Sequence, residues 1–448
     1  MLNSIEIIFK QLYNIDKNKG INMEYKHRII DEQFNARMDA LGAVLFIGPK
    51  GCGKTTTAKQ KAKTIIEFQD EEKRENLLLL ANNHPSDLLR HPKPILFDEW
   101  QDAPKIWGTI RKDIDDNQLV GAYILTGSSS QKVKTPHTGT GRISTLKMYP
   151  MSLFESGDSN GQVSLSSLFN DSTSFNGCIS ELSKDDIKHV ICRGGWPRSL
   201  SFVNKKAQLM ISKDLFEQTC NVDISNIDGV RKNPNWAKTI LKSYARNICT
   251  AADTSTVYKD IVSNCEMSKP TFYSYLSALE DLYIIDDVDA WCPSIRSKTV
   301  IRSLKKKNFI DPSIAVAALG ISPEYFDNDY KTMGFLFESL VIRDLRIYSS
   351  EHGGYVSYYR DRYGLEADAI LHLEDGRYAL IEIKLGQHDI EEGAKHLCEI
   401  EKLIKEYNEK EKQVPLRLPD LKIVITGTQY GYKREDGVLV IPIGCLKD

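Results

Sequence analysis

Hydrophobic and polar positions follow three different patterns along the chain. In the first part, short unbroken apolar runs end in glycine, acidic or hydroxyl residues. Such runs are typical of strands buried on both faces of a sheet. The clearest are 43–47, 94–97 and the apolar part of GAYILTGSSS. Residues 1–200 are therefore predicted to form an α/β domain with a parallel sheet.

A helical period replaces the strand pattern in the second part. Ser268 is placed to cap a helix, and the strand-like YIIDDVDAW follows that helix. Helices followed by such a strand resemble a winged helix-turn-helix, so residues 205–295 are predicted to form a helical, winged-helix-like domain. An earlier helix is indicated by apolar residues of WAKTILKSYARNI on one stripe: Ile240, Leu241, Tyr244 and Ile248.

Two strands around a tight turn are predicted in EADAILHLEDGRYALIEIKLG. A three-residue loop Glu-Asp-Gly, closed by glycine in the left-handed region, suits the turn. Counting back from this loop places Asp368 opposite Glu382. Glu366 then lies opposite Lys384, and all four share one face of the sheet. A two-residue loop at Asp-Gly would move Asp368 to the other face.

The third part, residues 296–448, is predicted to be a smaller α/β domain containing this hairpin. A helix is expected in TMGFLFESLVIRDLRIY, where Glu338 lies among apolar neighbours. An unpaired carboxylate is costly in such surroundings. Residues 156–184 are rich in Ser, Asn, Asp and Gly, which predicts a long surface loop or insertion.

Composition narrows the class of protein only a little. The 448 residues, 41% hydrophobic and 27% charged, suit a globular chain of about three domains. The net charge of −2 does not exclude a local basic patch. The sequence shows no bilayer-length apolar run and no secretory signal pattern. The nine cysteines lack CxxC spacing, which favours reduced thiols in a cytoplasmic protein.

The motif GPKGCGKT follows the first predicted strand and precedes a helix-compatible run. Its spacing is G-x-x-x-x-G-K-T, a loop whose backbone N–H groups surround phosphates. Lys54 is expected to reach the β- and γ-phosphates of ATP, and Thr55 to hold Mg²⁺. The predicted nucleotide contacts are Gly48, Pro49, Lys50, Gly51, Cys52, Gly53, Lys54, Thr55 and Thr56.

Further strand ends supply acidic and hydroxyl partners for the nucleotide. In KPILFDEWQDAP, Asp98 lies at the carboxyl end of a strand, where parallel sheets bind ligands. It is expected to bind the Mg²⁺ through water, and Glu99 to orient or deprotonate the attacking water. Thr126 or Ser128 is expected to sense the γ-phosphate from the next strand. An ordinary Ser-rich strand end is the alternative.

Two carboxylates that face each other across a hairpin repel unless a cation lies between them. A divalent metal ion is the usual solution, and oxygen ligands suit Mg²⁺ or Mn²⁺. Asp368 and Glu382 are therefore the predicted metal ligands. Lys384 would position water or stabilise charge on an attacked phosphate. The alternative is a polar sheet face held by cross-strand pairs such as Glu366 with Lys384.

The segment RSKTVIRSLKKK is the best candidate for contact with a nucleic-acid backbone. A solvated loop is the alternative. The helix capped by Ser268 is not basic apart from Lys269, so DNA contact by that helix competes with a role as nucleotide lid or protein contact. The predicted phosphate contacts in the basic segment are Arg296, Lys298, Arg302, Lys305, Lys306 and Lys307.

In this order, the P-loop, ILFDEWQDAP, YILTGSSS, TGTGRISTLKMYPMSLFE and ICRGGWPRSL resemble the AAA-like ATPases of bacteria and archaea that carry a C-terminal DUF4143 domain. The resemblance implies that Arg142 is an arginine finger or phosphate contact. A loop-anchoring ion pair is the alternative for Arg142. Gly195 and Pro197 also resemble the Gly-x-Pro element of signal-transducing switch ATPases, whose proline touches nucleotide.

The C-terminal constellation resembles the PD-(D/E)XK nuclease fold. That pattern has a helix glutamate, a strand aspartate and then Glu-x-Lys on the next strand. The proline that often precedes the aspartate is Ala367 here. The resemblance implies catalytic roles for Glu338, Asp368, Glu382 and Lys384.

These sites lead to one leading hypothesis and two alternatives. The leading one is an ATP-regulated, Mg²⁺-dependent nucleic-acid endonuclease acting on DNA ahead of RNA, with no membrane partner. The resemblance alone implies a setting in defence or mobile-element biology. The first alternative is an ATP/ADP-switched binding or signalling ATPase whose tail only recognises a partner or DNA. The second is a DNA-translocating ring, a homo-oligomer in which Arg142 reaches a neighbour's nucleotide.

Overall fold

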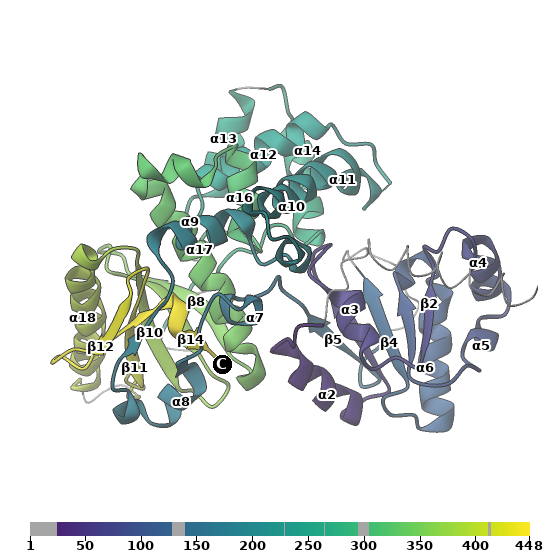
Figure 1. Ribbon diagram of the computed structural model, residues 1–448, viewed down its shortest axis with the longest axis horizontal. Helices are drawn as coiled ribbons and strands as arrows, with labels where there is room; N and C mark the ends of the chain where they lie inside the picture. The colour runs from purple at the N-terminus through teal and green to yellow at the C-terminus, as the bar shows by residue number, and fades with distance from the viewer. Residues whose placement is uncertain (1–24, 128–138, 228, 264, 294–303, 411–413) are drawn as a thin grey trace, which may run out of the picture.

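The computed structural model describes residues 25–127, 139–227, 229–263, 265–293, 304–410 and 414–448. Three parts are visible in Figure 1: a parallel sheet with flanking helices, a helical part, and a second, mixed sheet. The two sheets lie on either side, and the helical part lies above them in this view. Among the described helices, none combines the length and apolarity needed to cross a bilayer.

Five parallel strands form the first sheet, in the order β2-β3-β4-β1-β5. Alternate residues of β1 enter different cores, since Val44 packs with α2 residues and Leu45 with α6 residues. This burial on both faces explains the unbroken apolar runs and confirms the predicted parallel-sheet domain. The elements are α2 (Ile30–Ala40), β1 (Ala43–Ile47), α3 (Lys54–Lys59), β2 (Thr64–Glu67), α4 (Arg74–Asn83), α5 (Pro85–Leu88), β3 (Ile95–Asp98), α6 (Lys105–Asn117), β4 (Tyr123–Gly127) and β5 (Ile143–Lys147).

Helices make up the middle part, and Ser268 caps α14 through its side chain as predicted. After α14, Ile285 forms an isolated bridge to Phe309, and Val288 forms another to Lys306. The winged-helix interpretation stays a prediction, because these bridges do not extend into a regular hairpin within the described residues. The helices are α9 (Lys184–Arg193), α10 (Lys205–Gln218), α11 (Ile224–Asn226), α12 (Pro234–Arg246), α13 (Thr254–Val262), α14 (Lys269–Asp281) and α16 (Pro312–Leu319).

Contacts cross the predicted domain boundary at residue 296. Residues 304–310 pair with the middle part, and α16 packs against α9, α10 and α12. The sequence of α16, PSIAVAAL, is apolar nearly all round. Such a helix must be surrounded by other elements, and the helical part provides them.

The second sheet has seven strands, in the order β7-β12-β13-β11-β10-β9-β8. Strands β10, β11 and β13 are parallel, whereas the outer strands pair antiparallel. Helices α17 and α18 pack on it. The elements are α17 (Tyr330–Tyr348), β8 (Tyr355–Arg360), β9 (Glu366–His372), β10 (Tyr378–Lys384), α18 (Ile390–Asn408), β11 (Leu421–Thr426), β12 (Tyr430–Lys433) and β13 (Leu439–Pro442).

The predicted loop or insertion at residues 156–184 contributes strands to the second sheet region. Within it, β7 (Cys178–Ile179) joins the second sheet beside β12, and β6 (Val163–Ser164) pairs with β14 (Leu446–Lys447). These contacts cross the predicted end of the first domain at residue 200. The few apolar residues of this polar stretch suffice to dock it, because they are buried: Val163, Leu165, Leu168, Phe175 and Cys178.

A buried guanidinium joins the three parts. Arg343 of α17 donates to Asp311 at 2.8 Å and to Asp344 at 2.7 Å. Asp311, which begins α16, also accepts the N–H of Gly195 at 3.0 Å. Asp344 accepts the N–H of Leu153 at 3.0 Å. Both carboxylates are thus paired with a charge and with backbone from another part of the chain.

We expect Arg343→Met to destabilise the protein by about 3–5 kcal/mol, because it leaves two buried carboxylates without a counter-charge. The midpoint of urea unfolding, followed by circular dichroism, measures the change. Arg417→Ala is the control, since Arg417 and Asp420 form an exposed ion pair of little energetic weight. A midpoint for Arg343→Met no lower than that of the control would contradict the prediction.

Candidate functional site

The P-loop connects β1 to α3, and its backbone requires glycine. Gly48 has φ of 141°, and a Cβ at this position would lie 2.2 Å from the carbonyl oxygen of Met148. Gly53, directly before α3, has φ of 107°. Other residues rarely adopt such angles. The glycines predicted to shape the phosphate loop are therefore needed for its conformation.

Lys54, Thr55 and Asp98 come together at the ends of β1 and β3. The buried Lys54 Nζ donates to the carbonyl oxygens of Gly48 and Pro49, at 2.8 Å each. Thr55 Oγ1 donates to Asp98 Oδ1 at 2.7 Å. A hydroxyl beside a carboxylate is the pair that P-loop NTPases use to hold Mg²⁺, so these residues fit a magnesium nucleotide. The lysine would exchange its carbonyl bonds for bonds to phosphate.

Glu99 and Thr126 lie beside this pair. The Thr126 hydroxyl donates to Asp98, and Gln101 donates to the Glu99 carboxylate. Glu99 has φ of 52°, a left-handed conformation that is strained for a residue with a side chain. Strain of this kind gathers at functional sites, so the water-orienting role stays a prediction for Glu99. Ser128 lies outside the described residues.

Arg142 does not lie at the nucleotide site of its own chain. It precedes β5, and its carbonyl oxygen accepts the N–H of Ala43, at the amino end of β1. The P-loop begins at the other end of that strand, roughly 15 Å away. Arg142 Nε instead pairs with Asp115 at 2.7 Å. The anchoring alternative therefore describes Arg142 here, and a role toward a neighbouring copy stays a prediction.

The middle part covers the P-loop. Lys50 Nζ pairs with Asp223 at 2.6 Å, and a Cβ on Gly51 would lie 3.5 Å from Leu215 of α10. A Cβ on Gly53 would lie 3.6 Å from Pro197. Gly195 and Pro197 thus lie close enough to the loop for the predicted nucleotide contact, which stays a prediction.

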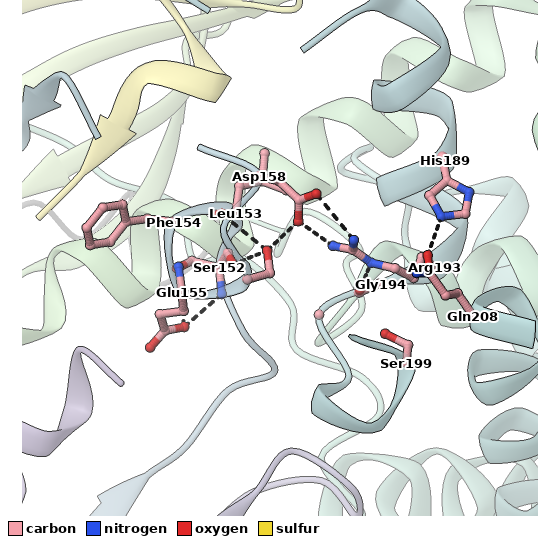
Figure 2. Close-up of polar contacts among 12 residues, drawn as sticks. Ser152, Leu153, Phe154, Glu155, Asp158, His189, Arg193, Gly194, Ser199 and Gln208 are labelled. Atoms are coloured by element: carbon pink, nitrogen blue, oxygen red, sulfur yellow. Dashed lines mark hydrogen bonds and ion pairs between the residues drawn. The ribbon is translucent and has the colours of Figure 1, made fainter. Parts of the chain in front are cut away.

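The sequence interpretation missed a buried arginine that ties the P-loop to the segment after β5. Arg28 donates to the Cys52 carbonyl at 2.9 Å and to Glu155 at 3.0 Å. Figure 2 shows Glu155 folded back onto Ser152 in a capping box. The pattern SLFE signals such a cap. Nothing local identifies Arg28, because its carboxylate partner lies 127 residues away.

The predicted hairpin register of the C-terminal strands is confirmed. Gly376 has φ of 87°, and the N–H of Leu373 donates to the carbonyl of Arg377 at 2.8 Å, as a three-residue loop requires. The pairing continues to Ile381 and Ala369. The ladder ends there, because the N–H of Ile383 donates to the side chain of Asp368 at 2.9 Å, so the placement of Asp368 directly opposite Glu382 stays a prediction.

Side chains from three segments meet around these carboxylates. Lys384 Nζ lies 2.5 Å from Glu382 Oε2 and 3.7 Å from Asp368 Oδ2. On the other side, Lys306 Nζ donates to Glu338 Oε1 at 2.6 Å and lies 3.8 Å from Asp368 Oδ1. The suggested cross-strand pair of Glu366 with Lys384 is absent, since Glu366 pairs with Arg360.

Burial and mutual repulsion perturb the acids of this cluster. Burial first, and then the charge of Asp368, raise the pKa of Glu382 to about 8 against the pull of Lys384. Burial likewise raises the pKa of Glu338 to about 7, opposed by Lys306. Burial alone would lower the pKa of Lys384, but Asp368 and Glu382 raise it above its usual value. Perturbed acids in a cleft are typical of functional sites.

A divalent metal ion does not fit between Asp368 and Glu382 in this arrangement. One oxygen of Asp368 faces Lys306, and the other faces Lys384 and accepts the N–H of Ile383 at 2.9 Å. The oxygens of Glu382 face Lys384 and His396. Ammonium groups thus stand where the metal ion was predicted. Within the described ranges, the three-residue group whose ligand atoms converge within 4.8 Å is elsewhere: Glu351, His352 and Asp448.

The predicted phosphate footprint is wrong for Lys306 and Lys307. Both side chains are buried, Lys306 against Glu338 and Lys307 against Asp287 at 2.9 Å. Each of these neighbouring lysines finds its own carboxylate partner inside the fold, and those partners lie far away in the sequence or on a segment that packs only in the folded chain. Lys305 is exposed and pairs with Asp289. The other predicted contacts, Arg296, Lys298 and Arg302, lie outside the described residues.

Three stretches of the chain match family models, none of them half its length. Residues 42–156 match a model described as an AAA domain, and residues 333–446 match the domain of unknown function DUF4143. Residues 184–325 match DUF8612, another domain of unknown function, which the sequence patterns did not predict. With the P-loop geometry, these matches identify a P-loop ATPase with a C-terminal DUF4143 domain. The nuclease-like fold of that domain stays a prediction.

Similar solved structures are distant. The Walker-type ATPase of Pyrococcus abyssi is 12% identical, over 66% of this chain and 99% of that one, with a TM-score of 0.40. The replication initiator DnaA bound to AMPPCP and single-stranded DNA is 14% identical, over 56% and 86%, with a TM-score of 0.26. A DNA replication initiation factor is also 14% identical, over 56% and 86%, at 0.24. No curated protein matches, and TM-scores this low carry no conclusion about function.

We expect Lys54→Ala to weaken ATP binding by about 10- to 100-fold, because a charge-assisted bond to phosphate is lost. Titration with a fluorescent ATP analogue measures the affinity. Arg142→Ala is the matched control and should leave the affinity unchanged, since its guanidinium lies at the far edge of the sheet. Equal losses in the two variants would show that Arg142 reaches a nucleotide after all.

Proposed function

We propose that this ATPase uses nucleotide binding to control a nucleic-acid-cleaving site in its C-terminal part. One observation carries the proposal: Lys384 pairs with both Asp368 and Glu382, and α17 brings Glu338 beside them, where it shares Lys306 with Asp368. The carboxylates are of the kind that nucleases use to act on phosphodiesters. Lys384 is placed to stabilise the charge that develops on an attacked phosphate.

The cleft beside this cluster has a lining that suits nucleic acid, which carries both phosphate charges and flat bases. It has a volume of about 600 Å³, within the range of pockets that hold small ligands. Lys184 and Lys331 line it together with Lys384, and Tyr330 and Phe335 contribute aromatic rings. Cations contact phosphates, and rings stack on bases. The lining thus supports nucleic acid as the substrate class.

A continuous set of contacts runs from the P-loop to the cleft. Pro197 lies beside the P-loop, and Gly195, two residues earlier, donates to Asp311. Asp311 pairs with Arg343, which lies on the same helix as Glu338. A nucleotide that moves the Gly195–Pro197 segment would therefore act on the helix that carries part of the acidic cluster. Spatial continuity supports regulation, and coupling measurements would establish it.

A nucleotide-switched binding protein is the second candidate. The filling of the predicted metal position by Lys306 and Lys384 favours it, because a cluster neutralised by lysines needs no metal ion. The cover of the middle part over the P-loop fits a switch that retains nucleotide. Such a protein would purify with ADP, hydrolyse ATP slowly and cleave nothing.

We expect the protein to cleave at least one of single-stranded, duplex or branched DNA or RNA when Mg²⁺ or Mn²⁺ and ATP are supplied. Asp368→Asn and Lys384→Met should each reduce cleavage by about 100-fold or more, as the loss of a charge-stabilising group does. Gel electrophoresis of labelled substrates measures the rate.

Glu366→Gln is the control for this experiment, because Glu366 lies on the same strand but pairs with Arg360 outside the cluster. Cleavage that survives Asp368→Asn and Lys384→Met would remove the nuclease proposal. Absence of cleavage in every nucleotide state, together with retained ADP, would favour the binding switch.

A further inference from the structure

We propose that Lys306 is a built-in counter-ion, which the middle part inserts into the acidic cluster to keep a divalent metal ion out. Withdrawal of Lys306 would open the cluster to the metal ion. The inference rests on the proposed function, because it concerns the regulation of the same site. It goes further in naming the group that closes the site and the part of the chain that supplies it.

The ammonium group of Lys306 is held by the C-terminal part on several sides. Lys306 Nζ lies 2.6 Å from Glu338 Oε1, 3.3 Å from the Asp368 carbonyl oxygen and 3.8 Å from Asp368 Oδ1. Only 3% of the residue is exposed. A cation in this position already contacts the helix glutamate and the strand aspartate that a metal ion would need.

The backbone of Lys306 belongs to the middle part instead. Its N–H donates to the Val288 carbonyl, and the N–H of Val288 donates to the Lys306 carbonyl, both at 2.9 Å. The next residue, Lys307, donates its N–H to Thr250 and pairs with Asp287. The same segment is also tied to the C-terminal part, because Ala290 bridges Tyr358 of β8 and the Tyr358 hydroxyl donates to the Leu304 carbonyl. Contacts on both sides therefore hold the ammonium group in the cluster.

Charge explains why Lys306 and a metal ion exclude each other. Three carboxylates, those of Glu338, Asp368 and Glu382, share the cluster with the ammonium groups of Lys306 and Lys384. Lys306 covers one oxygen of Asp368 and pairs with Glu338. A divalent ion would approach a like charge at contact distance in a buried site, where screening is weak. Removal of Lys306 leaves three carboxylates around one lysine, a set that attracts a hard cation.

The nucleotide site touches the same middle part that holds Lys306. Lys50 of the P-loop pairs with Asp223, and α10 packs beside Gly51 through Leu215. A nucleotide that changes these contacts would bind with different affinity to two arrangements of the middle part, one with Lys306 in the acidic cluster and one with Lys306 withdrawn from it. That difference is what a ligand needs in order to shift an equilibrium between two states.

Mn²⁺ binding to the full-length protein tests the proposal without a cleavage assay. Isothermal titration is performed without nucleotide in an Asp98→Asn background, which removes the carboxylate beside Thr55 at the P-loop. We expect Lys306→Met to gain one Mn²⁺ site at least 10-fold tighter than any in the Asp98→Asn parent. Addition of Asp368→Asn should abolish that site, which separates it from binding at Glu351 and His352.

A second variant guards against misfolding. Lys306→Met leaves Glu338 buried without its partner, so Lys306→Gln, which keeps a neutral hydrogen-bond donor beside Glu338, should gain the same site. Lys422→Met is the matched control, since Lys422 is a half-buried lysine of the same sheet that pairs with Glu401 at 2.6 Å, and it should gain nothing. Thermal unfolding confirms that each variant is folded.

The outcomes separate this inference from the proposed function. Equal Mn²⁺ affinity in the parent and in both Lys306 variants would overturn the role of Lys306, whatever the cleavage assay shows. A gained site that survives Asp368→Asn would overturn it as well. A gained, Asp368-dependent site in a protein that cleaves no nucleic acid would uphold the counter-ion and reject only the nuclease proposal.

Discussion

The buried guanidinium of Arg343 is the contact on which the arrangement of the three parts depends. A buried ion pair stabilises a fold only when hydrogen bonds satisfy all its charges. Here Asp311 and Asp344 each accept a bond from Arg343 and a backbone N–H from another segment. An alternative packing would break one of these bonds and leave a buried charge unpaired. The network therefore specifies how the middle part and the segment after β5 meet α17.

Electrostatics also governs the C-terminal cluster. Carboxylates that lie close together on β9 and β10 require positive charge, and sequence reasoning assigned that charge to a metal ion. The fold supplies it from two lysines, one beside Glu382 on the strand and one from residue 306. The two solutions use the same acids.

At the nucleotide site, in contrast to the acidic cluster, most of the predicted features depend on residues that are neighbours in sequence. The spacing of the P-loop, the strand before it and the acidic strand end at Asp98 were all predicted, since each depends on residues that are neighbours in sequence. The hairpin at Gly376 was predicted for the same reason, because turn geometry sets the register over a few residues. The roles of Arg28, Pro197 and Asp223 around the P-loop depend on segments that approach only when the domains pack.

The sequence by itself determined the parallel sheet, the phosphate loop and the three-residue turn that ends at Gly376. Periodicity, glycine conformation and turn length are local properties and act over short distances along the chain. Only the tertiary structure decided that residues 156–184 join the second sheet, that α16 belongs to the helical part and that Arg142 lies far from its own P-loop. It also decided that Lys306 enters the acidic cluster although 62 residues separate it from Asp368. The physical reason is that a charged side chain needs a partner only when packing removes it from water. Which side chains are removed from water depends on how whole helices and strands pack together.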